Sequence, residues 1–285
     1  IAYERGVFDV ATGAKVALEG YPIKVNGRGD SAIRQVFSED SKLYALYGRQ
    51  GLVVRELSSG KVLSYAVIPE DQVLNSFSIA FDTRKGGVYI AASDLLWLPW
   101  GSNEPRTIWK SGSGKRDSAG MRLLGDGKRA LIYGLHYVEL VSLGEGSAKL
   151  EKRWNLPNEW PYNAGLSDNG TLSTLSAGIV KTWDSKGRLV RTWASTIGQE
   201  WVSWTPDGYF DGSDRAAKSL VFIVRGAESF AIDQFYERFR RPDIIAARLR
   251  GEDTGKLAAA DITKGFSTPP AVELELVSLD AAKGR

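Results

Sequence analysis

The chain has 285 residues, of which 43% are hydrophobic and 25% charged, and its formal net charge is +3. It has no cysteine and one histidine, His136, which excludes disulfides, thiolate metal sites, cysteine nucleophiles and histidine-rich metal centres. The weak net charge gives no reason to expect nucleic acid as a partner, and no apolar run is long enough to predict a membrane span.

A unit of about 40 residues recurs along the chain. Its first marker is an apolar strand, a small polar turn that holds an aspartate, and a second apolar strand. These turn aspartates are Asp40, Asp82, Asp126, Asp168 and Asp207. A second marker, an aromatic residue in a later strand, keeps the same step at Tyr65, Trp109, Trp154 and Trp193. The two markers predict units at roughly 32–70, 75–112, 117–157 and 160–196, with a fifth unit that begins near Trp201.

Short strands of this kind cannot bury their faces alone, whereas units stacked around an axis bury both faces of every sheet. We therefore expect an all-β fold, namely a WD-like β-propeller of about five blades over residues 1–228. Residues 1–20 hold the last two strands of a unit. These strands either pair with those after Trp201 and close the ring, or follow further blades upstream of Ile1.

The repeated aromatic residues are expected to pack between the blades. Trp97 and Trp100, in the segment LLWLPWG, are the exception because they lie beside a proline and a glycine in a predicted turn. We therefore take these two tryptophans as candidate interaction residues.

A helical connector is predicted over residues 229–266. Its first helix carries an apolar stripe with helical spacing, formed by Ile232, Phe235, Tyr236 and Phe239. Pro242 and Asp243 suit the first turn of a second helix, which Gly251 ends, and a third short helix is expected near 256–263. In the final segment, 267–285, apolar and acidic residues alternate over 272–276, which predicts a strand. That strand either begins another β domain or adds to a sheet edge.

The segments EWVSWTPDGYFDGS (200–213) and IDQFYERFRRPDII (232–245) together resemble the junction found in bacterial proteins of the WD-repeat and caspase-like peptidase type. The matching residues are Trp201, Trp204, Thr205, Pro206, Gly208, Tyr209, Arg238, Phe239, Arg241, Pro242 and Asp243. The resemblance covers roughly residues 30–272. It implies a propeller followed by a linker, and a caspase-like domain as downstream neighbour or partner. Arg238, Arg241, Pro242 and Asp243 are then the candidate connector and docking residues.

The peptidase chemistry of that family needs a cysteine nucleophile, which this chain lacks. We therefore expect no enzyme activity, cofactor or metal in this chain. The expected function is protein–protein interaction, as a scaffold or sensor that regulates or targets a caspase-like peptidase domain. The compartment stays open between the bacterial cytoplasm and export. The alternative is a propeller hydrolase with a carboxylate or metal site on its axis.

Three further patterns carry weaker hypotheses. Asp207, Asp211 and Asp214 lie close enough in sequence to hold calcium, although turn chemistry explains them better. A cluster of arginines on the connector is interleaved with acidic residues, which favours ion pairs within the chain over nucleic-acid contact. The chain begins at Ile1 and ends at Arg285. We expect a processed or trimmed product, with Arg285 as a processing point because some bacterial caspase-like enzymes cut after basic residues.

Overall fold

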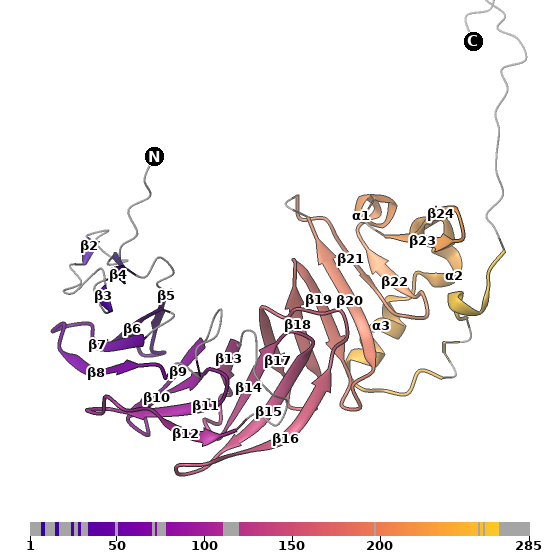
Figure 1. Ribbon diagram of the computed structural model, residues 1–285. Helices are drawn as coiled ribbons and strands as arrows, with labels where there is room; N and C mark the ends of the chain where they lie inside the picture. The colour runs from indigo at the N-terminus through magenta and orange to yellow at the C-terminus, as the bar shows by residue number, and fades with distance from the viewer. Residues whose placement is uncertain are drawn as a thin grey trace, which may run out of the picture. The chain divides into compact units, whose positions relative to one another are not determined.

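Strands make up most of the secondary structure. The computed structural model describes residues 34–48, 51–69, 72, 78–110, 120–196, 198–219, 221–255, 257–258 and 260–267, and the backbone of four two-residue strands between 7 and 29 (Figure 1). The chain forms two compact units, Ile1–Ala177 and Gly178–Arg285. The domain limits predicted at 228 and 266 stay predictions. The strand predicted at 272–276 and the processing point Arg285 lie outside the described residues.

The first unit consists of antiparallel strands joined by turns. In chain order the strands are β1 (Val7–Phe8), β2 (Lys15–Val16), β3 (Lys24–Val25), β4 (Arg28–Gly29), β5 (Arg34–Phe37), β6 (Leu43–Gly48), β7 (Gly51–Glu56), β8 (Val62–Val67), β9 (Ser78–Asp82), β10 (Gly87–Ala91), β11 (Leu95–Pro99), β12 (Arg106–Trp109), β13 (Gly120–Leu123), β14 (Arg129–Gly134), β15 (Tyr137–Leu143), β16 (Ala148–Asn155), β17 (Asn163–Leu166) and β18 (Leu172–Ser176).

Three four-stranded sheets follow one another in this unit, formed by β5 to β8, β9 to β12 and β13 to β16, each with its strands in sequential order. In addition β1 pairs with β2, β3 with β4, and β17 with β18. The three sheets coincide with the predicted units 32–70, 75–112 and 117–157. The expectation of a mostly β fold is therefore confirmed as a set of antiparallel sheets, and none of those formed by the described residues closes into a barrel.

Asp40 and Asp126 lie in the turns between the first and second strands of their sheets, and Asp82 is the last residue of β9, directly before the equivalent turn. The Asp126 carboxylate accepts the backbone N–H groups of Lys128 at 2.8 Å and Arg129 at 3.0 Å. In the first sheet, the Asp40 carboxylate accepts from the N–H of Lys42 at 3.2 Å and from the Ser38 hydroxyl at 2.7 Å. At the repeat of Asp168 the neighbouring Asn169 has this role, since its side-chain oxygen accepts the N–H of Thr171 at 3.1 Å. Aspartate and asparagine both satisfy turn N–H groups in this way, which explains the period of these turns.

The apolar residues of the middle sheet are buried on both faces. Val88 and Ile90 of β10 join a cluster with residues of the β5–β8 sheet such as Val54. The residues between them in sequence, such as Tyr89, join a second cluster that contains Ile132 of the β13–β16 sheet. The alternation of a strand places these side chains on opposite faces. The β9–β12 sheet therefore lies between its two neighbours.

The second unit combines strands with short helices. In chain order it contains β19 (Ile179–Trp183), β20 (Leu189–Ser195), β21 (Trp201–Trp204), β22 (Phe210–Gly212), α1 (Asp214–Ser219), β23 (Phe222–Arg225), β24 (Glu228–Ala231), η2 (Ile232–Phe235), α2 (Tyr236–Phe239), α3 (Pro242–Leu249) and η3 (Ile262–Lys264), where η marks a 3₁₀ helix. Strands β19 to β22 pair in sequence, and β23 pairs with β24.

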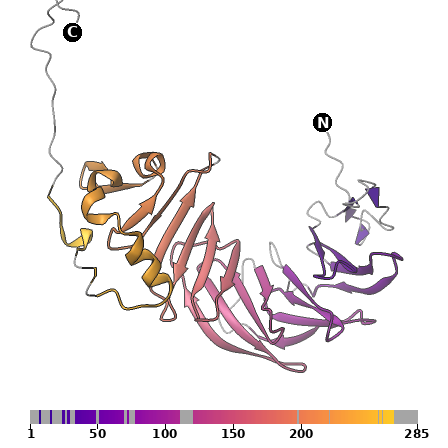
Figure 2. The same ribbon diagram turned by 180° about the vertical axis from the view of Figure 1, so that it is seen from behind.

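One apolar core joins the strands and helices of the second unit. It contains Val202 and Phe210 of the strands together with Phe235, Phe239 and Ile244 of the helices. Helix α3 lies beside β20 and β22, as the view from behind shows (Figure 2). The helices therefore cover one face of this sheet.

The structure differs from the predicted connector in three places, and it contains one unexpected helix, α1, before the connector. The predicted first helix is a 3₁₀ turn, η2, that continues into the single turn α2, and the predicted third helix is reduced to η3 within its described residues. The six residues of α1 are too few for an apolar stripe, and the helix is held by the burial of Ala216 and Ala217. Residues 229–231 belong to a hairpin, which turns at Gly226.

Candidate docking site on the helical connector

Of the two tryptophans singled out in the sequence, Trp100 lies in the predicted turn, whereas Trp97 lies within strand β11 and pairs with Tyr89 of β10. The Trp97 ring lies 4.6 Å from that of Tyr89, and Trp97 packs against the cluster shared with the third sheet. The Trp100 ring lies 6.3 Å from that of Phe81 and packs against the cluster shared with the first sheet. The structure gives each a packing role and does not bring them together. Their part in an interaction stays a prediction.

The Thr-Pro-Asp-Gly-Tyr motif attaches the connector to the sheet. The guanidinium of Arg248 in α3 donates two hydrogen bonds to the Asp207 carboxylate, at 2.7 and 2.6 Å. The Thr205 hydroxyl donates to the same carboxylate at 2.6 Å. The N–H of Ala260 donates to the Tyr209 hydroxyl at 2.8 Å, and the N–H of Ile262 donates to the Asp207 carbonyl at 3.0 Å. We call this set of contacts the latch.

Three of the four predicted connector residues shape the start of α3. Pro242 occupies its first turn, where its missing N–H costs no hydrogen bond. Arg241 donates two hydrogen bonds to the Asp243 carboxylate, at 2.8 and 2.6 Å, which hold the pKa of Asp243 below its usual range. The backbone N–H of Arg241 donates to the carbonyl of Phe210 at 3.0 Å. These contacts account for the Arg-Pro-Asp motif by local structure alone.

Arg238 is the fourth predicted residue, and it differs from the other arginines of the connector. Five arginines between 225 and 255 form ion pairs with carboxylates, namely Arg225, Arg240, Arg241, Arg248 and Arg250. Ion pairs within the chain were predicted for Arg238 and for four of these five arginines, namely Arg240, Arg241, Arg248 and Arg250. Within the described part of the chain, Arg238 has no such pair, and its guanidinium lies 5.6 Å from the centre of the Phe239 ring. Its charge is therefore available at the surface.

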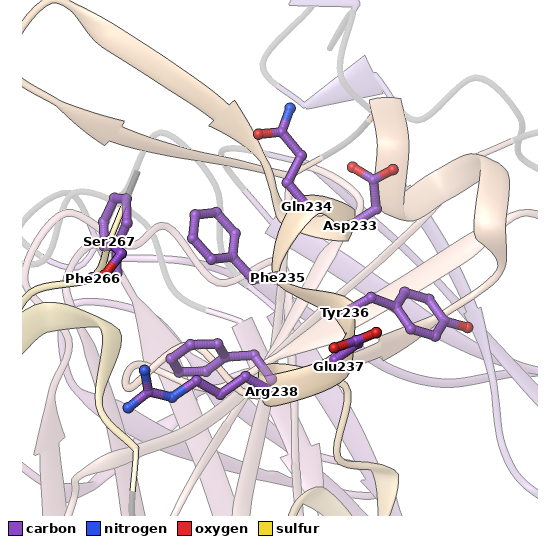
Figure 3. Close-up of a pocket in the computed structure, with 9 residues that line it drawn as sticks. Asp233, Gln234, Phe235, Tyr236, Glu237, Arg238, Phe266 and Ser267 are labelled. Carbon is purple, nitrogen blue, oxygen red and sulfur yellow. The ribbon is translucent and has the colours of Figure 1, made fainter. Parts of the chain in front are cut away.

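Arg238 borders a surface hollow of about 470 Å³ (Figure 3). The hollow is lined by η2, α2 and the chain after η3, with Asp233, Gln234, Phe235, Tyr236, Glu237, Arg238, Phe239, Phe266 and Ser267. The Phe235 and Phe266 rings meet edge to face with centroids 4.9 Å apart. In Figure 3 the Arg238 side chain extends toward the side of the hollow where Phe266 lies. The Asp233 and Gln234 side chains point away from Phe266 and Arg238. We call this site the connector hollow.

The walls of the hollow are fixed by contacts behind it. Phe235 is 9% exposed and Phe239 only 2%, because both belong to the core of the second unit. Phe266 also packs on Phe230 of β24, at 5.7 Å between ring centroids. Arg225 donates to the Phe266 carbonyl at 3.4 Å, which ties the end of this wall to the hairpin. The aromatic surface is thus preformed.

The lining of the hollow combines charged, hydroxyl and aromatic groups. Its charged groups are two carboxylates and one guanidinium, and its hydroxyl groups are those of Tyr236 and Ser267. The single histidine, His136, belongs to the first unit. The three aspartates considered for calcium each contact a different protein group, namely Arg248, Arg240 and the Tyr236 hydroxyl. Among the described residues no group of three or more side chains could hold a metal ion.

The sequence indicated part of this site. Phe235, Tyr236, Phe239 and Arg238 were identified as a helix stripe and a candidate docking residue. Phe266 was missed, because its approach depends on the chain folding back over roughly thirty residues. The sequence signal available for Phe266 was its position directly after Gly265, where the predicted third helix ends.

Comparisons with known proteins place no family on this chain: no family model and no curated protein matches it. Among solved structures, a functionally unknown protein from Desulfotomaculum acetoxidans is 15% identical, with a TM-score of 0.43 over 65% of this chain and 72% of that one. A protein of unknown function from Bacteroides caccae is 13% identical, with a TM-score of 0.37 over 58% of this chain and 65% of that one. None of the helices in the described ranges is both long and apolar enough to cross a membrane.

Proposed function

We propose that the chain is a non-catalytic protein-interaction module. In this proposal a WD-like β-propeller serves as a rigid scaffold, and the connector hollow docks a segment of a protein partner. The observation that carries it is the hollow itself, an aromatic surface bordered by an arginine that has no carboxylate partner among the described residues. Interaction sites are enriched in aromatic residues and arginine, and they lie where a rigid scaffold holds them.

Two features of the first unit support the propeller. The β9–β12 sheet buries both of its faces against the sheets before and after it, as a blade does. In addition β13, the first strand of its sheet, lies beside β9 and β17, the first strands of the adjacent sheets. Strands at the centre of a propeller meet in this way.

The proposal of a caspase-like peptidase as partner or downstream domain rests on the sequence resemblance. Five of the eleven residues that carry the resemblance belong to the latch or to the start of α3, namely Thr205, Tyr209, Arg241, Pro242 and Asp243. These residues support the proposal that the junction has the same architecture as in the proteins that it resembles. Arg238 differs from these five, because no intrachain ion pair explains it in the described residues.

Selection from a random heptapeptide library displayed on phage, with the full chain immobilised, tests the docking proposal. We expect selected peptides to bind the natural chain and to lose binding to Phe266→Ala, which removes one wall of the hollow. Tyr162→Ala is the matched control, because Tyr162 is 61% exposed and lies in the first unit. Failure to select any peptide, or equal loss of binding in the control, overturns the proposal. Unfolding transitions measured on each variant separate loss of the site from loss of the fold.

A further inference from the structure

We infer that the connector hollow recognises a short peptide segment with one apolar anchor between two opposite charges. The carboxylate of the segment pairs with Arg238, its apolar side chain packs on Phe235 and Phe266, and its basic group faces Asp233 and Glu237. This inference rests on the proposed docking function and names the chemistry of the partner segment.

The position for a carboxylate follows from Arg238. The other five arginines between 225 and 255 already contact a carboxylate, so an acidic ligand would have to displace those pairs. Arg238 is exposed and has no pair to displace within the described chain. Its guanidinium presents a planar set of donors that matches a carboxylate in a two-pronged arrangement. An incoming carboxylate is therefore favoured at this one arginine.

The anchor follows from the aromatic walls. Phe235 and Phe266 meet edge to face, at 82° between ring planes, and Phe266 meets Phe230 at 85°. A hollow of about 470 Å³ lies within the range of roughly 300–1,000 Å³ that small-ligand sites occupy. It therefore suits one or two side chains better than a broad protein surface. Aromatic and branched apolar side chains gain most from such walls.

The position for a basic group follows from Asp233 and Glu237. Both line the hollow, and neither forms an ion pair within the described residues. With Arg238 they give the hollow one positive and two negative charges, so a polyanion such as nucleic acid would be repelled there. A run of acidic residues is disfavoured for the same reason. The best ligand carries a single carboxylate on the Arg238 side and a cation on the other.

A bead-displayed heptapeptide library with phenylalanine fixed at its centre and all other positions random provides the test. On the full natural chain we expect Asp or Glu to be enriched on one side of the phenylalanine, and Lys or Arg on the other. Replacing the selected acidic residue by its amide is expected to weaken binding about tenfold, the effect of one hydrogen bond to a charged group. Arg238→Gln is expected to abolish the difference between acid and amide peptides, and Arg238→Lys to keep part of it.

Arg215→Gln is the matched control, since Arg215 is an exposed arginine of the same unit outside the hollow. Selected peptides without enrichment of acidic residues, or an acid preference that persists in Arg238→Gln, would overturn this inference while leaving docking intact. If no peptide is selected at all, the proposed docking function fails as well.

Discussion

Asp207 accepts hydrogen bonds from two elements that are far apart in sequence, the turn at Thr205 and helix α3 through Arg248. The side chains of Asp207 and Arg248 are 23% and 20% exposed, so water screens their interaction only in part. Removing one partner leaves the other with an uncompensated charge. The latch therefore depends on the charge of this one carboxylate.

Asp207→Asn is expected to lower the free energy of unfolding by about 1–3 kcal/mol at neutral pH, because it leaves the Arg248 guanidinium without a counter-charge. Urea denaturation monitored by tryptophan fluorescence measures the loss. Glu252→Gln is the control, since Glu252 also pairs with an arginine, Arg250, but is 52% exposed. We expect no measurable change in this control.

The difference in unfolding free energy between the natural chain and Asp207→Asn is expected to depend on pH. Burial alone would raise the pKa of Asp207, but the hydrogen bonds from Arg248 and Thr205 outweigh burial and hold this pKa below its ordinary value of 3.8. A pKa lowered by folding stabilises the protein above the unfolded-state pKa, and the stabilisation is lost as pH falls through the folded-state value. The difference between the natural chain and Asp207→Asn should thus stay constant from about pH 7 to 5 and shrink below about pH 4. A difference that already shrinks above pH 5 would exclude this carboxylate as its source.

At the scale of elements, η3 is held against the turn before β22. The N–H of Ile262 donates to the Asp207 carbonyl, and the Ile262 side chain lies over Gly208. Gly208 has a φ of +94°, and a Cβ at this position would lie 2.5 Å from Ile262 Cγ2. This glycine therefore allows both the turn and the close approach of η3.

Gly208→Ala is expected to destabilise the second unit through backbone strain and through the clash with Ile262. Gly226→Ala isolates the first effect, because Gly226 also has a positive φ, +62°, but nothing within 4 Å of its Cβ position. Strain alone costs about 1–2 kcal/mol, and the clash should add about 1–3 kcal/mol in Gly208→Ala. Equal losses in the two variants, measured by urea denaturation, would mean that η3 does not pack on this turn.

Elements that are set by contacts close in sequence could be predicted from the sequence. The aspartate turns predicted the sheet units, because Asp126 and its equivalents act within five residues of chain. Pro242 predicted the start of α3 for the same reason, since helix termini are set locally. Helix α1 and the closure of the hollow by Phe266 depend on contacts distant in sequence. Local periodicity contains no information about such contacts.

At the scale of the whole molecule, the proposed propeller predicts a compact chain. A ring closed by pairing of the first and last blades removes exposed sheet edges, whereas an open row of the same sheets keeps two of them. The repeats predict the same sheets in both cases, since each sheet requires only its neighbours. A measurement on the intact chain in solution therefore has to distinguish the two arrangements.

Small-angle X-ray scattering provides this measurement. A compact chain of 285 residues is expected to have a radius of gyration of roughly 19 Å, and a closed ring should lie near this value with a single-peaked distance distribution. An open row of sheets places its ends farther apart, so its radius of gyration is larger and its distance distribution has a long tail. Such a tail at low protein concentration, where association between molecules is absent, would exclude the closed propeller. The peptide-docking proposal would then stand on the second unit alone, because every residue that lines the connector hollow belongs to that unit.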